Sequence, residues 1–344
     1  MTYNQYKKAF EKEAYNSGYP EKYVNQCLEY ARVLLNNKVP VIYDTSHLAA
    51  LVGYKKEYIK RAVVYTPYFY RDFKILKKNG KYRQISEPLP NLKDIQIWIL
   101  DNILSNVKVS GFAKAYRKRV SIIENLKYHQ RQSKVLTIDL EDFFPSIKVK
   151  SVESVFKNLG YSKLLSNLFA KLCTRDNSLP QGAPTSPYLS NIYFKPADRL
   201  IATYCIANDI KYTRYADDLT FSGDFDEDKL LGLVEDVVKD LNLRINKKKT
   251  KLMTPNMRQT VTGVVVNQKP QVVFHKRNKL RQEIYFIRKF GLENHINNKH
   301  IKQSNYLNHI IGQVNFVLQI NPEDREFQEY RAFLFELKVP PHQE

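Results

Sequence analysis

Two adjacent carboxylates between two strand-like runs constrain the fold of this chain more than any other feature. The segment 211–223 reads KYTRYADDLTFSG, in which alternating runs flank Tyr215-Ala216-Asp217-Asp218. This pattern predicts a β-hairpin with Asp217 and Asp218 at its tip. Like charges so close together are costly unless a cation lies between them, and hard oxygen ligands suit Mg²⁺. The alternative interpretation is an ordinary Asp-Asp turn.

A third carboxylate, Asp139, ends an otherwise apolar run within LTIDLEDFFPSI. The run 135–140 predicts a buried strand. If the fold brings Asp139 beside the hairpin tip, three carboxylates complete a two-metal site, in which one ion activates a 3′-hydroxyl and the other stabilises the leaving pyrophosphate. The alternative is that Asp139 only caps the turn after its strand.

The remaining pattern mixes strands and helices without regular βαβ alternation, so the predicted fold class is α+β. The Asn79-Gly80 pair predicts the turn of an early hairpin, and Ser186-Pro187 predicts a helix start. Two short helices around Gly53 fit ordinary packing or a helix-turn-helix. The expected helices cover 1–35, 44–63, 91–104, 186 onward, 227–241 and three stretches of 276–340; the expected strands cover 68–86, 135–140, 211–223, 243–245, 261–266 and 271–275.

The net charge of +20 favours a polyanionic partner, of which nucleic acid is the commonest. Residues 239–302 hold sixteen Lys and Arg against three acids, whereas residues 217–236 hold eight acids and one lysine. A basic surface beside an acidic island suits a metal-dependent enzyme acting on nucleic acid, although uneven solubilising charge is the simpler alternative.

Three scattered cysteines form no Cys-x-x-Cys pair, so neither structural zinc nor a disulfide is expected. The N-terminal segment is polar and has no apolar signal core. No apolar run approaches the roughly 20 residues of a membrane helix. We therefore expect a cytoplasmic protein without a membrane partner.

Five blocks stand in the order and spacing typical of reverse transcriptases: KKNGKYRQI, LTIDLEDFFPSI, LPQGAPTSPYLSN, YTRYADD and LNLRINKKKT. Over about 65–275 the chain resembles that family. Within the family it is most similar to the retron enzymes, because it is short and because Val261-Thr262-Gly263 looks like their VTG motif. Asn125 to His129 resembles their Asn-Ala-x-x-His box, but Leu126 stands where Ala is usual. The role of this box stays open, the alternative being a helix turn with a satisfied histidine.

The resemblance implies a right-hand polymerase fold with fingers, palm and helical thumb. It implies an N-terminal helical segment at 1–64, fingers at 65–134, a palm with a fingers insertion at 135–265, and an RNA-binding thumb at 266–344. The implied activity is an RNA-directed DNA polymerase, that is, a nucleotidyltransferase that uses dNTPs.

The implied template-primer is a structured non-coding RNA, copied from one of its own 2′-hydroxyls into a branched RNA–DNA hybrid. Retron enzymes also take part in anti-phage defence with an effector protein. The alternatives are a group II intron-like or unassigned bacterial reverse transcriptase, or an RNA–DNA-binding scaffold or antitoxin subunit of a defence complex.

The resemblance also implies residue roles. Two Mg²⁺ ions would be held by Asp139, Asp217, Asp218 and the Leu140 carbonyl. Phe144 would act as the sugar gate, while Lys249 would neutralise or protonate pyrophosphate. The other implied nucleotide contacts are Lys81 and Arg83 as phosphate clamps, the backbone amides of Asp142 and Phe143, and Gln181 near the template base. The implied RNA contacts are Val261, Thr262, Gly263, Lys276, Arg277, Lys279 and Arg281.

Overall fold

The structure is a computed structural model that describes residues 2–77 and 80–338 of the 344-residue chain. The chain divides into two compact units. The first contains residues 1–118, 140–204 and 228–246, and the second contains residues 119–139, 205–227 and 247–344. Each unit is therefore assembled from three separate stretches of sequence. The division into fingers, palm and thumb stays a prediction.

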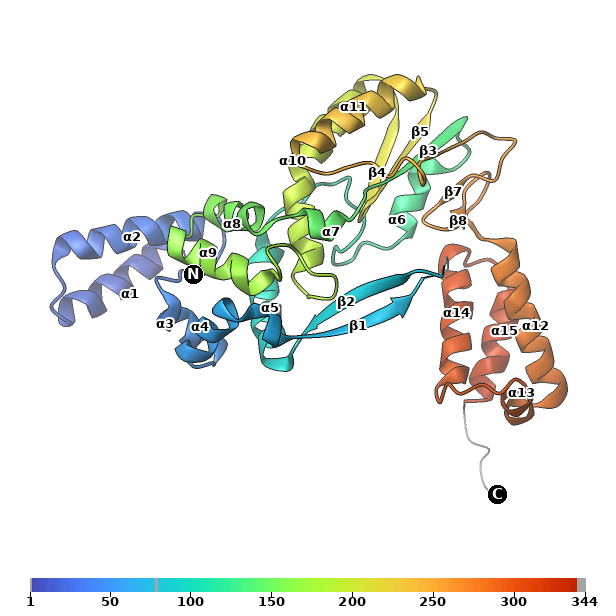
Figure 1. Cartoon of the computed structure of the whole chain (residues 1–344), viewed down its shortest axis with the longest axis horizontal. Helices are drawn as coiled ribbons and strands as arrows, with labels where there is room; N and C mark the ends of the chain where they lie inside the picture. The colour runs from blue at the N-terminus through green and yellow to red at the C-terminus, as the bar shows by residue number, and fades with distance from the viewer. Residues whose placement is uncertain (1, 78–79, 339–344) are drawn as a thin grey trace. The chain divides into compact units, whose positions relative to one another are not determined.

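The first unit holds the N-terminal helices, the long two-stranded hairpin and most of α10 and α11 (Figure 1). Its elements are α1 (Tyr3–Asn16), α2 (Glu21–Asn36), α3 (Thr45–Val52), α4 (Lys56–Val64), η1 (Thr66–Phe69), β1 (Tyr70–Leu76), β2 (Tyr82–Pro88), α5 (Pro90–Asn102), η2 (Leu104–Asn106), α7 (Phe143–Ser146), α8 (Val149–Asn158), α9 (Lys163–Cys173), α10 (Ser186–Ala207) and α11 (Glu227–Asp240).

The β1–β2 hairpin is antiparallel and pairs Tyr70 with Pro88 at one end and Leu76 with Tyr82 at the other. Its predicted turn falls on Lys78 and Asn79, which lie outside the described residues. The base of β2 packs against the loop before α10, where the Ser86 amide donates a hydrogen bond of 2.8 Å to the Gln181 carbonyl. A Cβ on Gly182 would lie 2.7 Å from the Ser86 carbonyl oxygen, so this close approach requires glycine.

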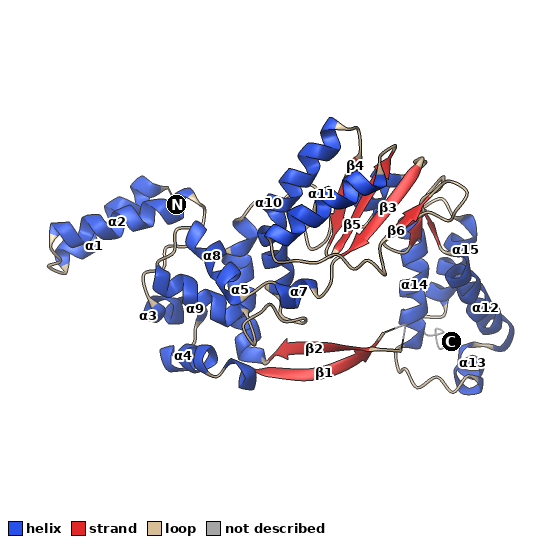
Figure 2. Cartoon of the chain, turned by 45° about the horizontal axis from the view of Figure 1, so that its top comes forward, coloured by secondary structure: helices blue, strands red, loops and turns tan. Residues whose placement is uncertain are grey.

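The second unit contains a four-stranded sheet, a small three-stranded sheet and a bundle of C-terminal helices (Figure 2). Its elements are α6 (Ile123–Leu126), η3 (Lys127–His129), β3 (Lys134–Asp139), β4 (Lys211–Tyr215), β5 (Asp218–Gly223), β6 (Lys251–Met253), β7 (Thr260–Val261), β8 (Val264–Val265), β9 (Gln271–Val272), α12 (Phe274–Phe290), α13 (Leu292–Asn298), α14 (Tyr306–Ile320) and α15 (Arg325–Glu336).

The larger sheet has the order β4-β5-β3-β6, with antiparallel pairing throughout. Residues directly opposite each other share a face. One face therefore carries two successive cross-strand rows, Tyr215-Asp218-Asp139 and Thr213-Thr220-Thr137-Lys251. The other face carries buried residues, among them Leu136, Ile138 and Leu219. Asp139 and Asp218 therefore lie on the same face as these threonines and Lys251.

The C-terminal helices share one hydrophobic core with the small sheet. Buried members include Val261 and Val264 on β7 and β8, Ile284 on α12, Val314 on α14 and Phe327 on α15. The same core reaches Leu126, Val135 and Met253 beside the larger sheet. The small sheet is therefore packed into the second unit with both the helices and the larger sheet.

Four predicted elements differ from the structure. The strand expected at 261–266 is instead two short strands, β7 and β8, separated by a turn at Thr262-Gly263. The strand expected at 243–245 is wrong, because only Ile245 makes an isolated bridge, with Leu140. The strand expected at 271–275 ends at Val272, since Phe274 already begins α12. The expected three C-terminal helices are four, α12 to α15, within the described residues.

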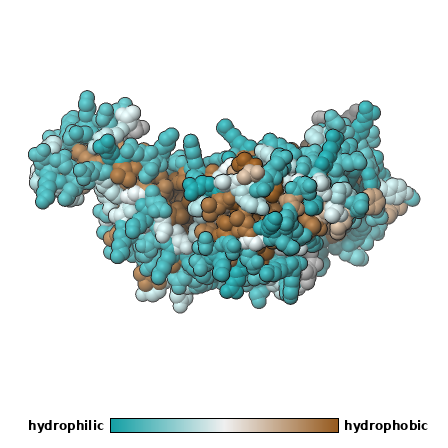
Figure 3. Space-filling view, turned by 90° about the horizontal axis from the view of Figure 1, so that it is seen from above, coloured by the Kyte–Doolittle hydropathy of each residue, from teal (hydrophilic) through white to brown (hydrophobic). Residues whose placement is uncertain are grey.

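No helix among the described residues is long and apolar enough to span a membrane. The face shown in Figure 3 is mostly hydrophilic, with separate apolar patches. This surface agrees with the 26% of charged residues in the sequence.

Candidate active site

The predicted hairpin exists and places two of the three aspartates opposite each other. Asp139, the last residue of β3, pairs in register with Asp218, the first residue of β5. Asp217 lies directly before Asp218, as the second residue of the two-residue turn between β4 and β5. The alternation of Thr137 with Asp139, and of Asp218 with Thr220, puts all four side chains on one face.

A pocket of about 470 Å³ opens on this face, and we call it the carboxylate pocket. Its walls come from the larger sheet, from the Lys249 region before β6 and from the turn between β7 and β8. The lining residues are Thr137, Asp139, Tyr215, Asp218, Thr220, Lys249, Lys251, Thr260, Thr262 and Gly263. Thr262 and Gly263 of the VTG motif therefore share this pocket with Asp139 and Asp218, whereas Asp217 is not among its lining residues.

The acidic side chains around the pocket influence one another electrostatically. Burial raises the pKa of Asp218 to about 6, and the charges of Asp217 and Asp139 act in the same direction. The Lys249 ammonium donates to both Asp139 oxygens, at 2.7 and 3.0 Å. This hydrogen bonding raises the pKa of Lys249. The crowded carboxylates are thus partly neutralised by a positive charge from the chain itself.

The donor chemistry fits Mg²⁺, because carboxylate oxygens are its preferred protein ligands and because Lys249 already serves as a cation there. Among the described residues, however, no group of three or more His, Cys, Asp or Glu side chains is gathered closely enough to hold a metal ion. The predicted metal site stays a prediction.

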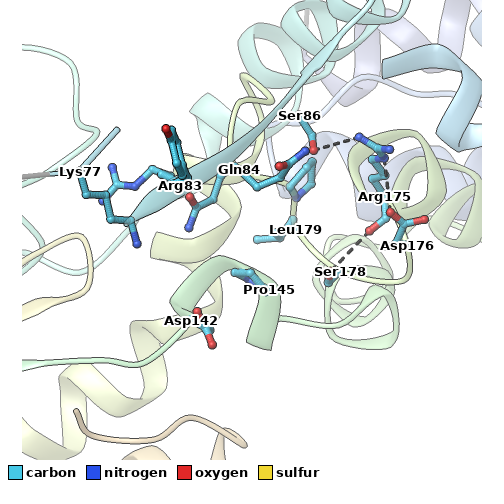
Figure 4. A pocket seen from close by; sticks show the side chains of 13 residues that line it. Lys77, Arg83, Gln84, Ser86, Asp142, Pro145, Arg175, Asp176, Ser178 and Leu179 are labelled. Atoms are coloured by element: carbon cyan, nitrogen blue, oxygen red, sulfur yellow. Dashed lines mark hydrogen bonds and ion pairs between the residues drawn. The ribbon is translucent and has the colours of Figure 1, made fainter. Parts of the chain in front are cut away.

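A second pocket, of about 300 Å³, lies within the first unit between β2 and the loop before α10. We call it the hairpin pocket. It brings together the predicted nucleotide contacts Arg83, Asp142 and Gln181. Figure 4 shows Arg83, Gln84 and Ser86 along the hairpin, with Asp142 and Pro145 across the pocket. Lys81, Phe143 and Phe144 are not among its lining residues.

Arg175 is a residue of the hairpin pocket that sequence reasoning missed. Its guanidinium forms a two-bond ion pair with Asp72 on β1 and donates a hydrogen bond of 2.9 Å to Ser86 on β2. The hydrogen bond from Arg175 lowers the pKa of Asp72 to about 2. Arg175 therefore ties both strands of the hairpin to the loop before α10. Arg175 and Asp72 are 103 residues apart in the sequence, so no local sequence pattern could have predicted their ion pair.

The predicted RNA contacts divide into four groups. Val261 is fully buried in the core of the second unit, whereas Thr262 and Gly263 line the carboxylate pocket. Lys276 and Lys279 are exposed on α12. Arg277 and Arg281 are instead paired with Asp324 and Glu326, with contacts of 2.6 Å. These two arginines tie α12 to α15, which weakens their assignment as RNA contacts.

The sequence of this chain is similar to that of a known protein family. Residues 75–307 match the family model described as reverse transcriptase (RNA-dependent DNA polymerase). The chain is 33% identical over 294 residues to Retron Ec86 reverse transcriptase of Escherichia coli, covering 84% of this chain and 88% of the relative. It is 32% identical over 274 residues to Retron Ec83 reverse transcriptase of Escherichia coli, covering 74% of this chain and 83% of the relative.

A solved structure of foamy viral protease-reverse transcriptase in complex with double-stranded DNA also resembles the chain. Its TM-score is 0.45 at 17% sequence identity, and the match covers 78% of this chain and 39% of that chain.

Proposed function

Because this chain belongs to the reverse transcriptase family, and within it to the retron-type enzymes, it is an RNA-directed DNA polymerase, and we propose that it copies a structured non-coding RNA starting from a 2′-hydroxyl of that RNA. The product would be a branched RNA–DNA hybrid. The carboxylate pocket carries this proposal, because it combines Asp139, Asp218 and Lys249 with the Thr262-Gly263 turn. We further propose a role in anti-phage defence with an effector protein, which rests on the family resemblance alone.

We propose that Asp139, Asp217 and Asp218 are the catalytic carboxylates. With the Leu140 carbonyl they would hold two Mg²⁺ ions, which supply the charge that activates the attacking hydroxyl and stabilises pyrophosphate. Lys249 would exchange its ion pair with Asp139 for the leaving pyrophosphate, to which its ammonium can donate a proton. The threonines of the pocket offer hydroxyls that can both donate to and accept from a sugar hydroxyl.

We propose that the hairpin pocket receives the incoming dNTP. The Arg83 guanidinium suits the bidentate binding of a phosphate, and Lys81 on the same hairpin adds a point charge. Gln181 would contact the nucleotide or its template base, while the Asp142 and Phe143 amides would contact the triphosphate. This assignment is supported by the structure of the pocket, because Arg83, Asp142 and Gln181 all line it.

The test is to purify the protein with its nucleic acid and to sequence both strands. Wild-type protein is expected to carry a DNA strand joined to one defined RNA through a 2′–5′ phosphodiester. The matched control is Asp217→Asn, a nearly isosteric change that removes one carboxylate charge from the hairpin tip. This variant should retain the same RNA, carry no DNA and extend a primer with Mg²⁺ at least about 100-fold more slowly.

Each result discriminates between the proposals. DNA attached to Asp217→Asn protein, or wild-type extension rates in that variant, would remove the catalytic assignment. DNA joined through an ordinary 3′–5′ bond would leave the polymerase but exclude the branched product. RNA without DNA in the wild type would favour the scaffold alternative.

A further inference from the structure

A buried hydrogen-bond network joins the Asn125–His129 segment to the strands that carry the aspartates. The His129 ring contacts Ser222 on β5 through Nδ1 and Thr213 on β4 through Nε2, each at 2.7 Å. The Thr213 hydroxyl donates to the Asn125 Oδ1, also at 2.7 Å. All four side chains have an exposed fraction of 0%. Three short hydrogen bonds therefore connect the Asn125–His129 segment, whose role the sequence did not settle, to the β4–β5 hairpin.

The direction of these bonds follows from the available hydrogens. Because Thr213 donates its only hydroxyl hydrogen to Asn125, its oxygen accepts from the His129 Nε2–H. The Ser222 hydroxyl lies 2.7 Å from the His129 Nδ1 and 3.5 Å from the Tyr128 carbonyl, and the shorter contact assigns its hydrogen to Nδ1. A neutral imidazole with its hydrogen on Nε2 thus offers one donor to β4 and one acceptor to β5. An apolar side chain of the same size offers neither.

The two anchor points fix how β4 lies against β5. Thr213 pairs directly with Thr220, and Ser222 pairs with Lys211, so His129 bridges the two strands diagonally. Both anchors point to the same face as Asp218, since they differ from Tyr215 and Asp218 by an even number of residues. A slip of one residue between the strands would turn one anchor to the opposite face. The bridge therefore opposes such a slip.

The turn at the end of this hairpin needs such support. Ala216 has a φ of 60°, in the left-handed region that costs a non-glycine residue of the order of 1 kcal/mol. The fully buried Arg214 holds the turn from inside the hairpin by donating to the Ala216 carbonyl at 3.0 Å. Strained residues persist only where their surroundings determine their conformation. The position of Asp217 and Asp218 therefore depends on what holds the two strands.

We propose that His129, held by Asn125, is a positioning residue that sets the placement of Asp217 and Asp218 by clamping β4 against β5. In this assignment His129 acts through Thr213 and Ser222, which belong to the two strands that carry the aspartates. The inference rests on the proposed catalytic role of the two aspartates. It assigns a function in DNA synthesis to the Asn125–His129 segment.

The experiment compares single-nucleotide incorporation by His129→Leu and His129→Gln. Leu fills the volume without hydrogen bonds, whereas the Gln amide keeps one donor and one acceptor. His129→Leu should lower the maximal incorporation rate about 10- to 100-fold, with the dNTP dissociation constant and RNA affinity changed less than about twofold. It should also raise the Mg²⁺ concentration for half-maximal activity. His129→Gln should restore the rate to within about fivefold of wild type.

Ile59→Ala supplies the control for lost stability, because Ile59 is fully buried on α4 in the first unit and far in sequence from the hairpin. It should lower the melting temperature while leaving the incorporation rate near wild type. If His129→Leu does not fold, Ser222→Ala removes the hydroxyl that contacts the His129 Nδ1 at 2.7 Å and the Tyr128 carbonyl at 3.5 Å. It should lower the rate with little loss of melting temperature.

Asp217→Asn, assayed in parallel, distinguishes failure of the catalytic assignment of the aspartates from failure of the positioning role of His129. If it remains active, the catalytic assignment fails. If it is inactive while His129→Leu or Ser222→Ala keeps the wild-type rate, the positioning role alone is excluded. Equal losses in His129→Leu and His129→Gln would likewise exclude it, since the hydrogen bonds would then not matter.

Discussion

Phe143 and Phe144 are neighbours in the sequence but differ in their surroundings. Phe143 is 2% exposed and packs edge-on against Phe194, with ring centroids 6.0 Å apart. Phe144 is half-buried and lies 6.3 Å from the exposed ring of Tyr116. Core packing therefore accounts for Phe143, which leaves Phe144 as the ring available to a nucleotide sugar.

Phe144→Ala is expected to weaken discrimination against rNTPs, because we propose that the Phe144 ring clashes with the 2′-hydroxyl of an rNTP. The ratio of incorporation efficiency for rNTP over dNTP should rise at least about tenfold. The measurement is single-nucleotide extension with matched dCTP and CTP. Phe143→Leu is the control and should leave the ratio unchanged; an unchanged ratio in Phe144→Ala would mean that another residue selects the sugar.

The site was partly readable from the sequence because its main signals are local. The apolar run before Asp139 predicted a strand, the alternating runs around Asp217 and Asp218 predicted a hairpin, and Ser186-Pro187 predicted the start of α10. The partners of His129 could not be predicted, since Thr213 and Ser222 lie 84 and 93 residues away. Arg277 and Arg281 looked like free cations for the same reason: Asp324 and Glu326 follow 47 and 45 residues later.

At the scale of elements, one carboxylate connects three helices and a loop of the C-terminal bundle. Glu283 on α12 accepts hydrogen bonds from His295 on α13, from Tyr306 on α14 and from Lys299 after α13, at 2.7 to 2.8 Å. Burial alone would raise the pKa of Glu283, but these bonds outweigh it and lower the pKa from 4.5 to about 2. The ionised carboxylate therefore stabilises the folded bundle.

The sign of the pH dependence follows from this lowered pKa. The stabilisation by Glu283 is complete above about pH 4.5 and is lost as the pH falls toward 2. Glu283→Gln should therefore melt below wild type at pH 7, and the difference should shrink between pH 4.5 and 3. Thermal unfolding across this range measures it. Glu329→Gln, an exposed change on α15, is the control; a difference that does not depend on pH would show that the charge is not responsible.

At the scale of the whole molecule, the net charge of +20 predicts strong and salt-dependent binding of nucleic acid. Much of that binding would be insensitive to sequence, because backbone phosphates carry the charge. The ion pairs of Arg277 and Arg281 leave Lys276 and Lys279 as the exposed cations of the predicted RNA-binding set on α12.

Lys276→Gln with Lys279→Gln should lower RNA affinity and flatten the plot of log affinity against log salt by about 1 to 2 units. Affinities for the cognate RNA and for a scrambled hairpin, measured across a salt series, test this. Lys12→Gln with Lys22→Gln removes the same charge from exposed sites on α1 and α2 and should leave the slope unchanged. Equal losses for both RNAs would mean that α12 supplies general attraction and no preference for the cognate RNA.

The strand order β4-β5-β3-β6 has a consequence for the chain as it leaves the ribosome. β3 pairs on both sides, with β5 and with β6, yet it is synthesised before either of them. About 80 residues separate the end of β3 from the start of β5. At about 5–20 residues per second, the apolar strand Lys134–Asp139 emerges some seconds before its first partner. During that interval both edges of a β-prone segment are open, so the nascent chain should depend on holding chaperones most strongly between the synthesis of β3 and that of β5.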